Sequence, residues 1–158
     1  MDAPCLRRSA RAPILRRVSP RIPIPLTPVP RLVLLYLAAG GVLGTLARYG
    51  LGKWISGHLG TGFPWHTLAI NLAGSLILGF ALRATETLAA TPETRGFLTV
   101  GFCGAFTTFS TFTWETAVLI QNGQWGRAAA YALGSVAAGL VCVFVGMSLA
   151  GALFRPRG

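Results

Sequence analysis

Apolar residues fill four long runs of the sequence, and short polar or glycine-rich segments separate these runs. The runs cover about residues 32–52, 66–83, 96–120 and 128–153. Each is close to the roughly 20 residues that an α-helix needs to cross the hydrocarbon core of a bilayer. The pattern therefore predicts an all-α membrane protein with four transmembrane helices. An even number of spans would place both termini on the same side of the membrane.

The segments between the runs have the composition of interface loops. Residues 53–65 are rich in glycine and lie between Trp54 and Trp65, whereas residues 84–95 are polar and residues 121–127 contain an Asn-Gly pair. Tryptophan is enriched where a membrane meets water, and Asn-Gly is typical of tight turns. We therefore expect loops over these three segments.

The third run contains an interruption. Five hydroxyl residues fall within seven positions, shortly after Gly101 and Gly104; they are Thr107, Thr108, Ser110, Thr111 and Thr113. Such residues are poor helix formers, because their side chains lose rotamers or compete for backbone hydrogen bonds. Non-helical backbone survives at membrane depth only where protein or water covers it. The sequence therefore predicts a third helix that is broken at its centre, at a functional site.

The composition is that of a membrane protein, and the position of the basic residues explains the net charge of +10 without a nucleic-acid partner. The chain is 53% hydrophobic and 11% charged, whereas an average soluble domain has about a quarter charged residues. Seven of the fourteen basic residues lie in the first 31 positions, among several prolines, so residues 1–31 are expected to be a disordered tail. After this tail, we expect a four-span domain over residues 32–154 and a basic C-terminal end over residues 155–158. No basic face is interleaved with aromatic residues, so nucleic-acid binding is not predicted.

Outside the tail, the basic residues are divided almost evenly between the two predicted sides. The terminal side has Arg31, Arg83, Arg95, Arg155 and Arg157, and the opposite side has Arg48, Lys53 and Arg127. This difference is weak under the positive-inside rule, so the core could insert in either orientation. Arg48 is expected in the last turns of the first span, where it is either a snorkelling interface residue or part of an anion entrance.

The interruption carries candidate chemistry for a small anion. Phe109 and Phe112 are three residues apart and share one helix face, and the edge of a phenyl ring is positive. Ring edges together with hydroxyl and amide donors could coordinate an anion without a fixed cation that would trap it. Asn71, in the second run, could offer its amide N–H₂ to the anion or could simply bond a neighbouring helix.

Two further features leave alternatives open. The break frees backbone carbonyls among Gly104, Ala105, Phe106 and Thr107, which could hold a sodium ion as discontinuous helices of transporters do. Glu115, three residues beyond Phe112, is either a functional intramembrane carboxylate or an end-of-span residue that reaches solvent.

Other reactive residues do not form a catalytic or metal-binding pattern. The three cysteines are widely spaced, and neither histidine has a partner at ligand spacing. The soluble segments are too short to hold an active site. We therefore do not expect an enzyme.

The sequence resembles the Fluc (CrcB) family of fluoride channels over roughly residues 33–154. Three segments carry the resemblance: Gly40-Gly-Val-Leu-Gly-Thr-Leu-Ala-Arg-Tyr49, Thr67-Leu-Ala-Ile-Asn-Leu-Ala-Gly74 and Gly101-Phe-Cys-Gly-Ala-Phe-Thr-Thr-Phe-Ser-Thr-Phe112. The resemblance implies an antiparallel, dual-topology homodimer of four-span subunits in a bacterial inner membrane. It also implies two fluoride pathways along the dimer interface.

The resemblance further implies roles for individual residues. A structural sodium ion would be held by the backbone carbonyls of Gly104 and Thr107, although Ala105 stands where the family usually has glycine. Arg48 and Glu115 are candidates for a vestibule or a gate. The residues that match the fluoride pathway are Asn71, Phe109, Phe112, Ser110, Thr111, Tyr131 and Ser135.

Three functional hypotheses follow. The leading one is a passive channel that exports fluoride and lowers its toxicity. A second is a small proton-coupled multidrug-type exporter that uses Glu115, although the first run lacks the membrane glutamate that such transporters carry. A third is a membrane assembly factor that transports nothing.

Overall fold

A computed structural model describes residues 30–154, and this part of the chain is helical apart from its turns. Residues 1–29 of the tail predicted over 1–31 lie outside it, as does the basic end over 155–158, whereas Arg31, expected in the tail, already belongs to the first helix. The elements in chain order are α1 (Arg31–Leu59), α2 (Trp65–Thr87), α3 (Pro92–Gly96), the π-helical η1 (Phe97–Cys103), α4 (Gly104–Phe106), α5 (Phe109–Gln121) and α6 (Trp125–Leu153).

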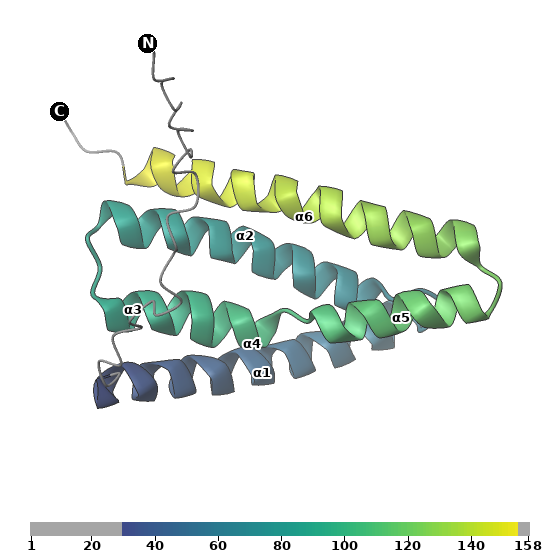
Figure 1. Ribbon diagram of the computed structural model, residues 1–158, viewed down its shortest axis with the longest axis horizontal. Coiled ribbons are helices and arrows are strands. Elements are labelled where there is room, and N and C mark those ends of the chain that lie inside the picture. Colours follow the sequence, from purple (N-terminus) through teal and green to yellow (C-terminus); the bar gives the residue numbers. More distant parts are fainter. Residues whose placement is uncertain (1–29, 155–158) are drawn as a thin grey trace, which may run out of the picture.

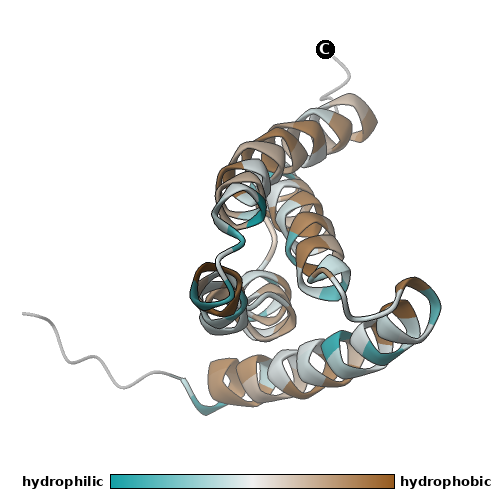
Figure 2. Ribbon diagram, turned by 90° about the vertical axis from the view of Figure 1, so that its right-hand side faces the viewer, coloured by the Kyte–Doolittle hydropathy of each residue, from teal (hydrophilic) through white to brown (hydrophobic). Residues whose placement is uncertain are grey.

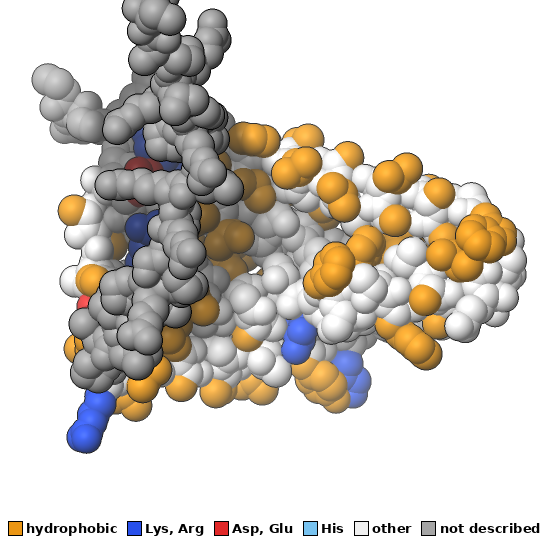
Figure 3. Space-filling view, viewed as in Figure 1, with side chains coloured by type: hydrophobic (Ala, Val, Ile, Leu, Met, Phe, Trp, Pro, Cys, Tyr) orange, Lys and Arg blue, Asp and Glu red, His pale blue; other side chains and the backbone are white. Residues whose placement is uncertain are grey.

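The long helices lie side by side, and the shorter ones follow one another along the same length (Figure 1). Three helices, α1, α2 and α6, are long and apolar enough to cross a membrane. Hydrophobic residues predominate along α6 and over the first part of α1 (Figure 2), and hydrophobic side chains are distributed over the visible surface of α5 and α6 (Figure 3). Many of the large ones are exposed, among them Leu35 and Leu46 on α1 and Leu133 and Phe144 on α6. Apolar outer surfaces of this extent require a lipid environment. The fold is therefore that of an all-α, multi-pass membrane protein.

The structure corrects the expected ends of two helices. Helix α1 continues to Leu59, so that the loop expected over residues 53–65 is reduced to residues 60–64, where Gly60 has a φ of 72°. Arg48 consequently lies in the interior of α1, not in its last turns. Helix α2 continues to Thr87, and the hydroxyl groups of Thr85 and Thr87 donate to the carbonyls of Ala81 and Arg83 one turn earlier, so the helix accommodates both residues.

Helix α1 packs with its backbone directly against η1 and α4. A Cβ atom added at Gly40 would lie 2.9 Å from the Phe102 nitrogen, and one at Gly44 would lie 3.0 Å from the Phe106 nitrogen. A Cβ at Gly41 would meet no atom within 4 Å. Gly40 and Gly44, four residues apart, therefore let the two helix backbones approach closely, as small residues do in membrane helices.

Helices α2 and α6 form a second close pair. A Cβ atom at Gly79 would lie 2.9 Å from the Val143 carbonyl carbon, and one at Gly146 would lie 2.8 Å from the Phe80 nitrogen. This contact fixes the position of α6, and therefore of Tyr131, relative to the second helix.

The third apolar run is interrupted where the hydroxyl residues gather. Thr107 has φ −80° and ψ 160°, and Thr108 has φ −147° and ψ 113°, so both are extended between α4 and α5. The preceding η1 is a π-helix, a form that is rare and frequent at functional sites. The predicted break is thus observed, at Thr107 and Thr108.

Candidate functional site

The break in the third run is held by one amide side chain from α2. The Thr108 backbone N–H donates to Asn71 Oδ1 over 2.8 Å, and Asn71 Nδ2 donates to the Thr108 carbonyl over 3.1 Å. Asn71 therefore bonds both backbone groups of a residue that no longer belongs to a helix. These two bonds use one of its two amide hydrogens. Asn71 was expected to bond a neighbouring helix or to offer its amide to an anion; it bonds the non-helical backbone at the break, and its second amide hydrogen is not used by these two bonds.

The Thr108 side chain caps the N-terminus of α5. Its Oγ1 accepts from the Thr111 backbone N–H over 3.3 Å, which is the geometry of an N-cap. The same hydroxyl donates to Thr111 Oγ1 over 3.0 Å and lies 3.4 Å from Ser110 Oγ. Three hydroxyl groups thus gather at the N-terminus of α5, the positive end of the helix dipole.

Because of these bonds, the backbone N–H groups of Thr108 and Thr111 do not donate to the carbonyls that they would bond in a continuous helix. In a continuous helix, the Thr108 and Thr111 N–H groups would donate to the carbonyls of Gly104 and Thr107. Here they donate to Asn71 and to the Thr108 hydroxyl. Arg48 Nη1 is 3.5 Å from the Thr107 oxygen, which is a long contact. The break therefore leaves the Gly104 and Thr107 carbonyls without their usual helical donors, and the Thr107 carbonyl accepts only the long bond from Arg48.

Aromatic rings form a row on the other side of α5. The centroids of Phe109 and Phe112 are 5.7 Å apart, and those of Phe112 and Tyr131 are 5.1 Å apart. Phe63 meets Tyr131 edge-on at 5.4 Å. Phe109 is 76% exposed, whereas Tyr131 is only 2% exposed. The row therefore runs from the outside of the subunit to its interior.

Glu115 ends this row and does not reach solvent as a free side chain. The Tyr131 hydroxyl donates to Oε2 over 2.7 Å, and the Thr67 hydroxyl donates to Oε1 over 2.8 Å. His66 Nε2 lies 3.3 Å from Oε1, and the Glu115 side chain is 15% exposed. Both carboxylate oxygens of Glu115 therefore accept a hydrogen bond from a neighbouring helix.

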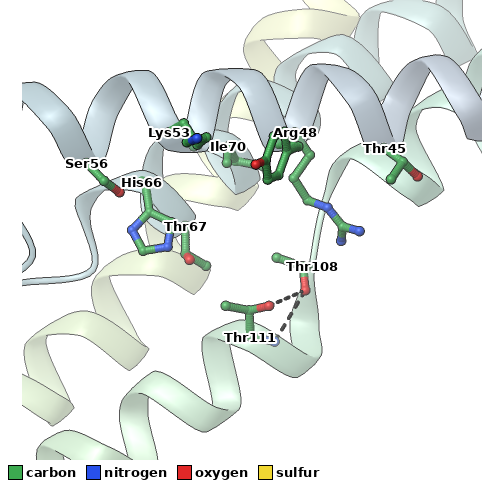
Figure 4. A pocket seen from close by; sticks show the side chains of 11 residues that line it. Thr45, Arg48, Lys53, Ser56, His66, Thr67, Ile70, Thr108 and Thr111 are labelled. Carbon is green, nitrogen blue, oxygen red and sulfur yellow. Dashed lines mark hydrogen bonds between the residues drawn. The ribbon is translucent and has the colours of Figure 1, made fainter.

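Two cavities flank the break. The first, of about 490 Å³, lies between α1, α2 and α5 and is shown in Figure 4. Its lining includes the basic side chains of Arg48 and Lys53. The second, of about 300 Å³, is lined by polar groups of Asn71, Ser75 and Thr107 and by Phe109. Thr108 borders both cavities, so the break separates two openings.

Comparison with known proteins places the chain in a family. The family described as CrcB-like protein, Camphor Resistance (CrcB), matches residues 35–147. The chain belongs to the CrcB family. A relative from Thermus thermophilus is 50% identical over 119 residues, which cover 75% of this chain and 94% of the relative.

Two further CrcB-family relatives come from Acidobacterium capsulatum and Chlorobaculum tepidum. The first is 46% identical over 114 residues, covering 72% of this chain and 91% of the relative. The second is 46% identical over 117 residues, covering 73% and 92%. All three relatives are named fluoride-specific ion channel FluC. The resemblance to the Fluc (CrcB) family is confirmed. The relatives are named as channels, which are not enzymes, and this agrees with the expectation that the chain is not an enzyme.

The structure brings together most of the predicted site residues of this CrcB-family chain. Asn71, Ser110 and Thr111 gather around Thr108, while Phe109, Phe112 and Tyr131 form the aromatic row. Ser135 lies one turn beyond Tyr131 on α6. Its Oγ is buried and has no hydrogen-bond partner among residues 30–154.

Sequence reasoning missed His66, Thr67 and Phe63. His66 and Thr67 open the second apolar run, and Glu115 lies near the end of the third. Because consecutive spans run in opposite directions, the start of one and the end of the next lie at the same membrane depth. Matching polar residues by depth would have paired Glu115 with this site.

Proposed function

We propose that this protein is a fluoride channel that passively exports fluoride across a bacterial inner membrane and lowers its toxicity. Hydrogen fluoride is a weak acid that crosses membranes and dissociates inside, where the anion is trapped. The inside-negative potential then drives the anion out through an open pore. One observation carries the proposal: aromatic rings and hydroxyl groups converge at a helix break, in a chain whose 46–50% identical relatives are named fluoride-specific channels.

The pathway would follow the aromatic row and its hydroxyl groups. The edges of Phe109 and Phe112 face the anion, and Asn71, Ser110 and Thr111 supply donors. Ser135 Oγ is a buried hydroxyl without a partner in the described chain, and a passing anion would provide one. The Tyr131 hydroxyl is already donated to Glu115, so this residue would border the pathway with its ring.

The functional unit would be an antiparallel homodimer of four-span subunits. The segment from Pro92 to Gln121 would serve as the third span, alongside α1, α2 and α6. Phe109 is 76% exposed beside an open cavity that also exposes polar groups of Asn71, Ser75 and Thr107, and open polar groups are unfavourable in lipid. A second copy would enclose it. The nearly even distribution of basic residues is compatible with insertion in both orientations.

A structural sodium ion would lie at this dimer interface. The carbonyls of Gly104 and Thr107 are backbone oxygens without their usual helical donors, which is the ligand type that broken helices offer to sodium. One subunit supplies two such oxygens, and a second copy would double that number. The ion would neutralise carbonyl dipoles and fix the break.

Fluoride efflux from liposomes that contain the purified protein tests the proposal, with chloride as the comparison ion. We expect efflux of fluoride and not of chloride. Phe109→Ile or Phe112→Ile should lower the efflux at least about tenfold, because an aliphatic side chain lacks a positive edge. Phe144→Ile is the matched control, since Phe144 is 64% exposed on α6, away from the row.

Unchanged efflux in both ring variants would show that the aromatic row is not the pathway. Proton-dependent transport of an organic cation without fluoride efflux would favour the multidrug-type exporter instead. Transport of no ion at all would favour the assembly factor.

A further inference from the structure

His66 is the basic side chain that contacts the carboxylate at the end of the aromatic row. Among residues 30–154, no other basic group lies within ion-pair distance of Glu115. The imidazole extends from the first turn of α2 and borders the cavity shown in Figure 4. Its side chain is 33% exposed, so water can deliver and remove a proton.

An ionised carboxylate at this position opposes the passage of an anion. Glu115 follows Phe112 by three residues on α5, and it is joined to Tyr131, whose ring contacts Phe112. A fluoride ion beside Phe112 and an ionised Glu115 would repel each other strongly, because water is partly excluded there and screens their charges poorly. The hydroxyl groups of Thr67 and Tyr131 stabilise the carboxylate but do not cancel its charge. A protonated His66 would cancel it.

The other ionisable groups around His66 are engaged elsewhere. On α1, Arg48 extends towards the Thr107 carbonyl, and Lys53 lies over the Tyr49 ring, 5.5 Å from its centroid. On α6, Arg127 donates to the Gly62 carbonyl over 2.7 Å. Arginine and lysine keep their charge throughout the physiological range, whereas histidine changes charge between about pH 5 and 8.

We propose that His66 is a positioning residue for anion conduction: it pairs with Glu115 and determines how much negative charge a fluoride ion meets beside Phe112. This inference rests on the proposed function. Protonation of the imidazole adds the compensating charge, so conduction rises as the pH falls through the histidine range. Deprotonation removes that charge, and conduction falls as the pH rises.

The test is the fluoride current of the purified full-length protein in planar bilayers, with the same pH on both sides and protein-free bilayers subtracted. We expect the wild-type current to increase about two- to tenfold between about pH 8 and about pH 5.5. His66→Gln should give a low current with a flat profile. His66→Arg, which carries a permanent charge, should give a high current with a flat profile.

His58→Gln is the matched control, since His58 is bonded to the Trp54 carbonyl at the end of α1, away from Glu115. It should keep the wild-type profile. A flat wild-type profile, or a profile that His66→Gln and His66→Arg both retain, would overturn the inference while leaving the fluoride channel intact. Absence of any wild-type fluoride current would instead overturn the proposed function.

Discussion

The two kinds of contact that hold this bundle together differ in their chemistry. Where α1 meets η1, and where α2 meets α6, glycines bring backbones together and few polar groups are involved. At the break between α4 and α5, the backbone is held almost entirely by side-chain hydrogen bonds from Asn71 and Thr108. The first kind tolerates no added volume, whereas the second tolerates no loss of a donor or acceptor. The glycine contacts fix the positions of the helices, and the hydrogen-bonded break places polar groups between them.

The largest expected effect is the loss of the folded protein when the α1 glycine contact is filled. Gly40→Val would place its Cβ 2.9 Å from the Phe102 nitrogen, a backbone atom that cannot rotate away. Overpacking that neighbouring side chains can absorb costs about 1–3 kcal/mol. Here two backbone segments would have to separate, so the loss exceeds that range and little monodisperse protein should remain in size-exclusion chromatography. Gly41→Val is the control, because a Cβ there meets no atom within 4 Å. Equal behaviour of the two variants would contradict the close packing.

A smaller loss is expected when the break loses its amide. Asn71→Leu keeps the branched shape of the side chain but leaves the Thr108 N–H without its acceptor, whereas the Thr108 carbonyl keeps the first helical bond of α5. A buried donor without a partner costs about 1–3 kcal/mol, so thermal unfolding in detergent should show destabilisation of about 1–3 kcal/mol, together with loss of fluoride efflux. Asn122→Ala, in an exposed turn, should change stability by less than about 0.5 kcal/mol. Full stability of Asn71→Leu would mean that another group holds the break.

The smallest expected effect on stability separates function from structure. Ser135→Ala removes a buried hydroxyl that has no partner in the described chain, so the free energy of unfolding should be unchanged or should increase by up to about 1 kcal/mol. Fluoride efflux should nevertheless fall, because the proposed pathway loses a donor. Efflux equal to that of the wild-type protein would remove Ser135 from the pathway.

Much of the fold could be predicted from the sequence because its signals are local. The four apolar runs correspond to α1, α2, the segment from Pro92 to Gln121, and α6. Hydroxyl residues placed the break correctly, since their effect on a helix operates within one turn. Helix ends were less accurate: the tryptophan and glycine residues near position 54 indicated a loop, yet α1 continues to Leu59.

The partners of the polar residues could not be predicted in the same way. Asn71 and Thr108 are 37 residues apart, and Thr67 and Glu115 are 48 apart. Which face of a membrane helix meets protein and which meets lipid is poorly encoded in hydrophobicity, because lipid tails are as apolar as a helix interface. The role of Asn71 therefore stayed open, and the contact between His66 and Glu115 was missed.

By itself, the sequence determined that the chain is helical and apolar and where its third apolar run is interrupted, because these properties depend on composition and on neighbours within a few residues. Only the tertiary structure decided that Asn71 bonds the backbone of Thr108 and that Glu115 meets Tyr131, Thr67 and His66. The physical reason is that a polar group in an apolar surrounding must find a partner, and which partner it finds depends on how the helices are arranged in space.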